Sequence, residues 1–175
     1  MKLSRSKDEN DTLSEEIKEC NAFSPNLAVD IHNNAGGGDG AEAFYHYGGG
    51  KSKTFAENIL SEVVNVGQNS RGAKIRKNSN GKDYYGFIRE TSCHAVIVEC
   101  AFVDNATDLK IIATESDRQK VGQAIAKGIL KTLGVEIQSE RLYRVQVGAY
   151  LLRSNADDMQ KRIKAVGFDA FIVKE

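Results

Sequence analysis

The chain has 175 residues, of which 41% are hydrophobic, and its 24 Lys and Arg residues balance its 24 Asp and Glu residues. This length suits one domain of ordinary size and part of a second one. Because the net charge is zero, the composition gives no reason to expect nucleic acid or a membrane surface as a partner. No apolar run approaches the ~20 residues that span a bilayer. The polar first residues lack the apolar core of a signal peptide, so we expect no export signal in them.

The predicted elements of the first half alternate between helices and strands. A helix is predicted over residues 12–20, because a Thr and a Glu three residues later have the spacing of a capping box. Residues 26–32 form a short apolar run typical of a buried strand. Residues 41–47 predict a second strand, rich in aromatic side chains. A glycine turn then precedes a helix over residues 52–66, whose apolar side chains follow helical spacing.

The second half of this region continues the alternation. Residues 71–88 are polar and interrupted by glycines, and we assign no helix or strand to them. Residues 95–98 are continuously apolar, as in a strand that is covered on both faces. A long helix is predicted over residues 116–133, with Gly134 where a C-terminal cap belongs. Strands separated by helices predict an α/β layered sheet for the first 135 residues or so.

The C-terminal tail has its own pattern after a polar link over residues 135–140. Residues 143–149 alternate between apolar and polar side chains, which predicts a half-buried strand. Residues 155–166 predict a helix, and residues 168–173 begin another strand, so the tail is expected to be a β-α-β unit. The inward side chains of its helix are expected to be Ala156, Met159, Ile163 and Val166.

The three cysteines are Cys20, Cys93 and Cys100. Their number is odd and no Cys-x-x-Cys spacing occurs, so they predict neither a disulfide framework nor a metal or redox motif. We interpret them as small hydrophobic residues of the core.

Two residues that can do chemistry, His32 and Glu99, each follow a predicted buried strand. Ligand sites of α/β sheets usually lie where strands end. A neutral imidazole binds Zn²⁺, and a nearby carboxylate can take a proton from metal-bound water. From spacing alone, a structural role stays open for both. The other two histidines are weaker candidates, since His94 belongs to the opposite end of its strand and His46 lies inside an aromatic-rich strand.

Several segments keep one order along the chain. They are Val-Asp-Ile-His-Asn-Asn-Ala at residues 29–35, Gly-Ala-Glu-Ala-Phe-Tyr at 40–45, Arg-Gly-Ala-Lys at 71–74 and Ile-Val-Glu-Cys-Ala-Phe-Val-Asp-Asn at 97–105. They resemble, in turn, a metal-histidine motif, the strand after it, an Arg-Gly-x-Lys segment and the catalytic-glutamate strand of zinc-dependent N-acetylmuramoyl-L-alanine amidases. Residues 4–14 are similar to the entry to a helix in that family.

The resemblance implies a three-layer α/β/α amidase domain over residues 1–135. Amidases of this family cleave the bond between the lactyl group of N-acetylmuramic acid and L-alanine of the stem peptide. Their likeness to this chain implies that His32 is a zinc ligand and that Glu99 is the general base. The family's other two zinc ligands, a His and a Glu, lie upstream of the matched region. We therefore expect weak zinc binding and poor hydrolysis from this chain, as for part of a longer enzyme.

Residues 142–175, with Val-Gln-Val-Gly-Ala-Tyr at 145–150, resemble the first half of a SPOR (sporulation-related) repeat. That module is ferredoxin-like, with two β-α-β halves, and binds glycan strands stripped of stem peptides. The resemblance implies a partial SPOR domain over residues 142–175. A half-module is expected to be less ordered than the amidase region, or to be stabilised by docking on it or on a second copy, which would give a homodimer.

The leading functional hypothesis is a cell-wall amidase, an autolysin or a phage endolysin, that uses Zn²⁺ and acts on peptidoglycan in the cell wall or outside the cell. The alternative is a non-catalytic peptidoglycan-binding protein on a decayed amidase scaffold, and tightly bound zinc would separate the two. A third hypothesis is an ordinary α/β domain whose motif matches are accidental. The amidase hypothesis also predicts that the strands with His32 and Glu99 are adjacent or one apart, with both side chains at one edge of the sheet.

Overall fold

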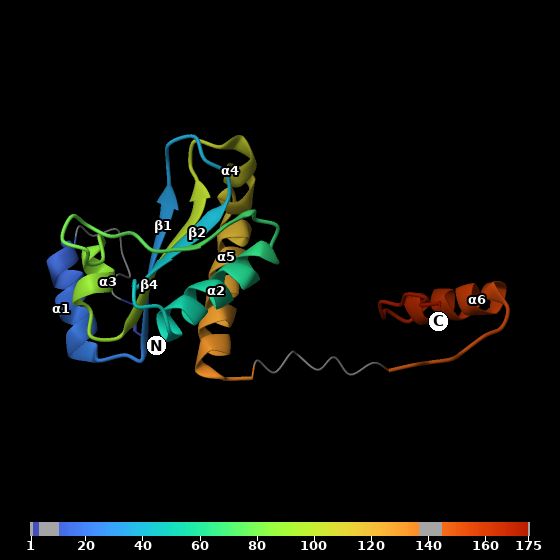
Figure 1. Cartoon of the computed structure of the whole chain (residues 1–175). Helices are drawn as coiled ribbons and strands as arrows, with labels where there is room; N and C mark the ends of the chain where they lie inside the picture. The colour runs from blue at the N-terminus through green and yellow to red at the C-terminus, as the bar shows by residue number, and fades with distance from the viewer. Residues whose placement is uncertain (1, 4–10, 137–144, 175) are drawn as a thin grey trace. The chain divides into compact units, whose positions relative to one another are not determined.

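A computed structural model of the chain describes residues 2–3, 11–136 and 145–174 (Figure 1). The chain divides into two compact units, residues 1–137 and 138–175. In chain order the elements of the first unit are α1 (Leu13–Phe23), β1 (Leu27–Asn34), β2 (Ala41–Tyr45), α2 (Lys51–Val64), β3 (Ser70–Lys74), α3 (Gly86–Glu90), β4 (His94–Phe102), α4 (Ala106–Ile112) and α5 (Glu115–Leu133).

The described strands form one mixed sheet in the order β1-β4-β2-β3. β1 is parallel to β4, β2 is antiparallel to β4, and β3 is parallel to β2. β4 is one of the two inner strands, and its residues 95–98 are buried, as the continuous apolar run predicts. β4 also continues to Phe102, so Glu99 lies within the strand rather than just after it.

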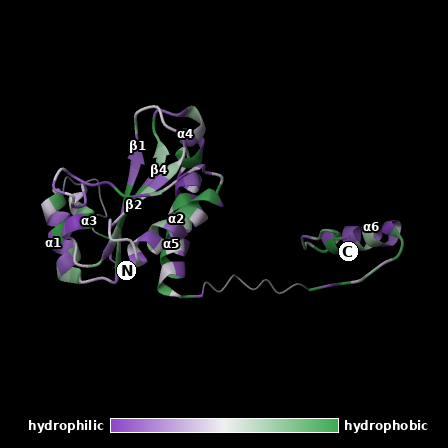
Figure 2. Cartoon of the chain, viewed as in Figure 1, coloured by the Kyte–Doolittle hydropathy of each residue, from purple (hydrophilic) through white to green (hydrophobic). Residues whose placement is uncertain are grey.

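Helices cover both faces of the sheet, which confirms the three-layer α/β/α prediction. In Figure 1, α2 and α5 lie on one side of the strands, and α1 and α3 lie on the other. Figure 2 shows that β1 becomes hydrophilic toward its C-terminal end, where the candidate site lies. The first face packs on a core of Ala41, Ala43, Phe55, Ala56, Ile59, Leu60, Val63, Val96, Val98, Cys100, Val121, Ala124 and Ile125. The second face packs on Ile17, Phe44, Phe87, Ile88, Ala95 and Ile97.

Two predicted helices have an end where the sequence predicts a cap. Thr12 and Glu15 form the reciprocal capping box of α1, and α5 ends at Gly134 in the left-handed conformation. A second capping box, between Thr114 and Asp117, starts α5. These caps satisfy backbone groups that a helix end otherwise leaves unpaired.

Three elements were not predicted from the sequence: β3, α3 and α4. β3 is an edge strand of the described sheet with charged side chains, so it lacks the apolar alternation that identifies strands. α3 has five residues, too few to show helical periodicity. α4 depends on its cap, because the Asn105 side chain accepts hydrogen bonds from the N–H groups of Thr107 and Asp108.

The C-terminal unit contains helix α6 (Arg153–Ala165), close to its predicted range. The two strands predicted on either side of it do not form: residues 145–150 and 168–174 have no strand structure. The first two residues of the predicted strand, 143–144, lie outside the described residues. Isolated strand pairs are marginal in water, and here the would-be strand side chains are exposed, with Val145 at 85% and Phe171 at 81%. The β-α-β pattern was therefore wrong about the strands, because alternation alone supplies no partner strand.

Within the described residues, no helix combines the length and the apolar character that crossing a membrane requires.

The contact between α2 and α5 depends on a glycine. A Cβ added at Gly128 would lie 2.6 Å from the Ile59 Cα, so the two helix backbones could not stay as close. Gly128→Ala is expected to lower the free energy of unfolding by about 1–3 kcal/mol. Chemical denaturation monitored by circular dichroism measures this.

The matched control is Gly122→Ala, in the same helix, where an added Cβ meets nothing within 4 Å. Replacing a helical glycine by alanine should stabilise the protein there by ~0.5–1 kcal/mol. Equal effects of the two substitutions would contradict the close packing of α2 on α5.

Candidate active site

The two predicted site residues, His32 and Glu99, are direct neighbours. In the parallel pairing of β1 with β4, His32 lies opposite Glu99, which confirms the predicted adjacency. In the antiparallel pairing of β2 with β4, Glu42 lies opposite Glu99 on its other side. Because cross-strand partners point to the same face, these three side chains form a row across three strands, ~4.8 Å apart from strand to strand. The row lies on the face that α1 and α3 partly cover.

The His32 imidazole is held by Asp30. Residues two apart on a strand point to the same face, and His32 Nε2 lies 2.9 Å from a carboxylate oxygen of Asp30. This hydrogen bond raises the pKa of His32, while partial burial acts in the opposite direction. The His32 side chain is 52% exposed, so the ring is accessible to a ligand from solvent.

The Glu99 carboxylate is the least satisfied polar group of the row. Its Oε2 atom is buried, and the structure gives it no hydrogen-bond partner among the described residues. Burial raises the pKa of Glu99 above its ordinary value, the negative charges of Glu42 and Asp30 add to the increase, and His32 acts against it. A carboxylate in this state is a stronger proton acceptor than one in water.

The negative charge of Glu42, by contrast, is balanced by two neighbouring cations. The Glu42 side chain is 8% exposed and accepts hydrogen bonds from Asn34 Nδ2 at 3.0 Å, from Arg71 Nε at 3.0 Å and from Lys74 Nζ. These two cations hold the pKa of Glu42 below its usual range despite the opposing effect of burial. Glu42 and the Arg-Gly-Ala-Lys segment belong to the motifs identified in the sequence, but the sequence alone indicates no role for them.

A bulge in β3 brings both cations to Glu42. Arg71 and Lys74 are three residues apart, so a regular strand would place them on opposite faces. The pairing of β2 with β3 shifts between Ala41 and Ala43, and Gly72 there has a φ of +83°. Two residues of β3 thus oppose Glu42, and both cations reach it. A glycine between two basic residues was the one sequence signal for this arrangement.

Two aspartates position the loop that follows β1. Asp104 accepts hydrogen bonds from the N–H groups of Gly36 and Gly37, which lowers the pKa of its carboxyl group. Asp108 is completely buried and accepts hydrogen bonds from the N–H groups of Gly40 and Phe102. The loop after His32 is thereby fastened to the end of β4, the strand that contains Glu99.

The other two histidines do not join the row. His94 begins β4 and forms a 3.3 Å hydrogen bond with Ser52. His46 follows β2, lies 3.4 Å from the Asp83 carboxylate and accepts a hydrogen bond from the N–H of Gly48. The structure thus brings His32, and neither His46 nor His94, beside Glu99.

The side chains of the described residues determine whether this site can hold a metal ion. Among them, no three His, Cys, Asp or Glu side chains are grouped so that they could hold a metal ion. His32 supplies one imidazole, and catalytic zinc normally takes three protein ligands. The part of the chain that the structure describes therefore does not complete a zinc site by itself.

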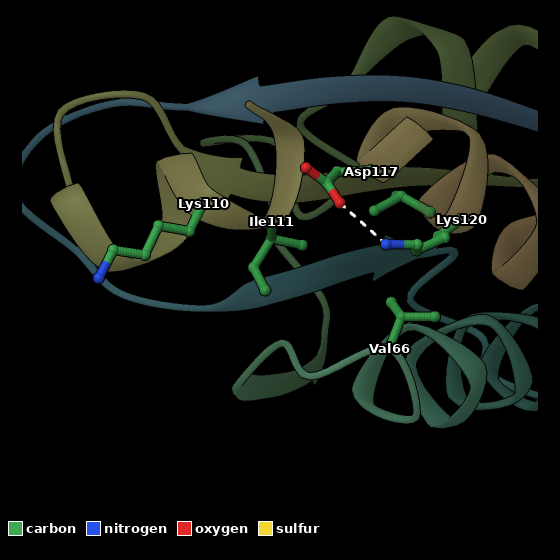
Figure 3. Close-up of a pocket in the computed structure, with 6 residues that line it drawn as sticks. Val66, Lys110, Ile111, Asp117 and Lys120 are labelled. Atoms are coloured by element: carbon green, nitrogen blue, oxygen red, sulfur yellow. Dashed lines mark hydrogen bonds and ion pairs between the residues drawn. The ribbon is translucent and has the colours of Figure 1, made fainter. Parts of the chain in front are cut away.

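A small pocket of about 70 Å³ lies elsewhere (Figure 3). It is lined by Val66 after α2 and by residues of α4 and α5, including an ion pair of 3.0 Å between Lys120 and Asp117. Val66 and Ile111 pack on the core of the opposite sheet face from the His32 row. Typical ligand pockets measure roughly 300–1,000 Å³, so this one is too small to bind a glycan or a peptide.

With this geometry in place, the sequence comparisons decide the family. The sequence profile of N-acetylmuramoyl-L-alanine amidase matches residues 1–131, about three quarters of the chain. The chain belongs to the N-acetylmuramoyl-L-alanine amidase family. The profile of the SPOR domain matches residues 118–174. Residues 118–131 fall within both matches, and the structure places them in α5 of the amidase unit.

Individual relatives agree with the assignment to this family. The N-acetylmuramoyl-L-alanine amidase CwlM of Bacillus licheniformis is 30% identical over 173 residues, which cover 98% of this chain and 66% of the relative. The chain thus spans slightly less than two thirds of that protein's length. Cwp6 from Clostridium difficile is 35% identical with a TM-score of 0.72, over 74% of this chain and 21% of that one. The catalytic domain of CwlV from Bacillus (Paenibacillus) polymyxa var. colistinus is 29% identical with a TM-score of 0.65, over 75% and 71%.

The buried Oε2 of Glu99, which has no hydrogen-bond partner among the described residues, gives a stability prediction for the metal-free chain. Glu99→Gln removes a partly buried charge, so it is expected to raise the free energy of unfolding at neutral pH by about 1 kcal/mol, a modest value because the group is partly solvated. Because folding raises the pKa of Glu99, ionisation opposes folding above that pKa. The advantage of the variant should therefore shrink as the pH falls through the folded-state pKa toward the unfolded one.

The control for this prediction is Glu57→Gln on α2. Glu57 is exposed and paired with Lys53 on the helix surface, so its replacement should change the stability by less than ~0.5 kcal/mol. Urea denaturation at several pH values measures both variants. A loss of stability on Glu99→Gln would show that its carboxylate has a partner in solution.

Proposed function

We propose that this chain hydrolyses peptidoglycan as an N-acetylmuramoyl-L-alanine amidase, cutting the amide between N-acetylmuramic acid and L-alanine of the stem peptide. The observation that supports it most is the direct pairing of His32 with Glu99, whose buried Oε2 has no partner among the described residues. An unsatisfied buried carboxylate is costly unless it is used. Family membership and relatives that are themselves amidases support the same reaction.

In this proposal His32 is a zinc ligand and Glu99 is the general base. A bound zinc ion would polarise the amide carbonyl and lower the pKa of a bound water to about 7. His32 supplies one of the three ligands that such an ion takes, and Asp30 fixes the orientation of the His32 ring.

Glu99 performs the proton transfers. With its pKa raised by burial, its carboxylate accepts a proton from the attacking water. The protonated carboxyl group then donates that proton to the departing amine of L-alanine, which is otherwise a poor leaving group. Glu42 stays ionised between its two cations, so its negative charge favours the protonated form of Glu99 after the first transfer.

We assign the amidase domain to residues 1–135 and a partial SPOR domain to residues 142–175. The SPOR match supports binding to peptidoglycan glycan strands, and the site of action would be the bacterial cell wall or the space outside the cell. Dimerisation through the C-terminal unit stays a prediction that no observation supports.

A second candidate function is a non-catalytic peptidoglycan-binding protein on the amidase scaffold. The observation in its favour is that, in the part of the chain that the structure describes, no group of three side chains could hold a metal ion. The two functions differ in zinc content and in hydrolysis.

Product analysis on purified peptidoglycan tests the proposal. The 175-residue chain is expected to release new L-alanine amino termini slowly. A version extended at its N-terminus by the family's segment with the other two ligands should release them rapidly, without new reducing sugar ends. In the extended version, Glu99→Gln is expected to lower the rate by about 10²- to 10⁴-fold, and His32→Ala should abolish activity with loss of zinc.

Glu57→Gln and His94→Ala serve as controls, because both residues lie away from the row. An extended version that binds zinc but is equally active with Glu99→Gln would contradict the assigned base. Full activity of the 175-residue chain would contradict the expectation that His32 alone is not enough to hold a catalytic zinc ion.

A further inference from the structure

Two segments far apart in the sequence are tied together by the side chain of Asn21, near the end of α1. Its Oδ1 accepts hydrogen bonds from the N–H of Ser92 at 2.8 Å and from the Ser92 hydroxyl at 3.0 Å. Its Nδ2 donates to the Glu90 carbonyl at 3.0 Å. Three hydrogen bonds thus fix the end of α1 against the turn that precedes β4. Each of these segments has a cysteine directly beside Asn21 or Ser92.

These cysteines, Cys20 and Cys93, form a thiol pair. Both are free and half-buried, and Cys20 lies close enough to Cys93 to raise the pKa of the Cys93 thiol. The third thiol, Cys100, is buried in the core on the opposite face of the sheet, where α2 and α5 pack. Cys100 therefore cannot compete with either member of the pair. The sequence interpretation of all three cysteines as core residues holds for Cys100 alone.

We propose that Cys20 and Cys93 form an intrachain disulfide when the protein meets a small-molecule disulfide oxidant. This inference does not depend on the proposed function. A thiolate of the pair attacks the oxidant, and a mixed disulfide forms as one small thiol leaves. The second cysteine then attacks the mixed disulfide and displaces the other small thiol. Two S–H bonds and the oxidant's S–S bond break, one protein S–S bond forms, and the two protons end on the two small thiols.

The environment of the pair determines the order of these steps. Burial, together with the neighbouring Cys20, raises the pKa of the Cys93 thiol to about 11. Cys93 is therefore rarely a thiolate at neutral pH, and the thiolate is the nucleophile in disulfide exchange. We assign the first attack to Cys20 and the closing step to Cys93.

The disulfide would fasten α1 to the sheet. Among the described residues of α1, Ile17 alone is buried, so few packing contacts hold this helix. The crosslink would close a loop of about 70 residues, and the stabilisation from a loop of that length is large in the chain-entropy model. α1 also borders the candidate site, because Glu16 contributes to the electrostatic environment of His32. Oxidation would therefore fix a helix at the edge of the site.

The test oxidises the reduced, folded 175-residue chain with oxidised glutathione. The expected result is that free thiols fall from three to one per chain, the intact mass decreases by two hydrogen atoms, and peptide mapping finds Cys20 joined to Cys93. The melting temperature should rise on the order of 10 °C, and dithiothreitol should reverse the rise.

Single variants separate the pair from the third cysteine. Cys100→Ser should still form the crosslink and retain no free thiol, whereas Cys93→Ser should keep one glutathione on Cys20 with no rise in melting temperature. A crosslink that includes Cys100, a crosslink between two chains, or an unchanged mass of the full chain would each overturn the proposal. The intact mass of the unmutated chain shows whether the disulfide forms, even if a variant fails to fold.

Discussion

The parallel pairing of β1 with β4 determines where the polar groups of the site lie. Its register places His32 opposite Glu99, and side chains at alternate positions along both strands then have fixed faces. A slip of one residue would move His32 and Asp30 to the face that α2 and α5 cover. The apolar residues of β4, buried on both faces, hold this register, since any shift would expose part of the core.

The row across the sheet combines two carboxylates in opposite electrostatic conditions. Glu42 lies between Arg71 and Lys74 and is stabilised in its charged form, whereas Glu99 has a buried oxygen with no hydrogen-bond partner among the described residues and is pushed toward its neutral form. Neighbouring carboxylates whose environments push their pKa values apart are typical of acid–base sites. Glu42 therefore has a positioning role in this account, because its charge and its cations define the surroundings of Glu99.

The sequence predicted the elements that have strong local signals. The capping box at Thr12 located α1, and the apolar run before Glu99 located β4. His32 and Glu99 could be singled out because polar residues follow buried strands. The roles of Arg71 and Lys74 could not be predicted, since only the bulge at Gly72 brings them to one face. The tail strands could not be excluded from the sequence, because alternation at residues 143–149 describes a face without showing what covers it.

We propose that His32, beside Glu99, is the metal-binding imidazole of this chain. The most direct measurement is an NMR titration with zinc that follows the ring nitrogens of the three histidines in the 175-residue chain. The His32 ring signals are expected to shift first, and this response should weaken when Asp30→Ala removes the partner of the ring. Zinc-induced shifts at His46 or His94 with no change at His32 would contradict it.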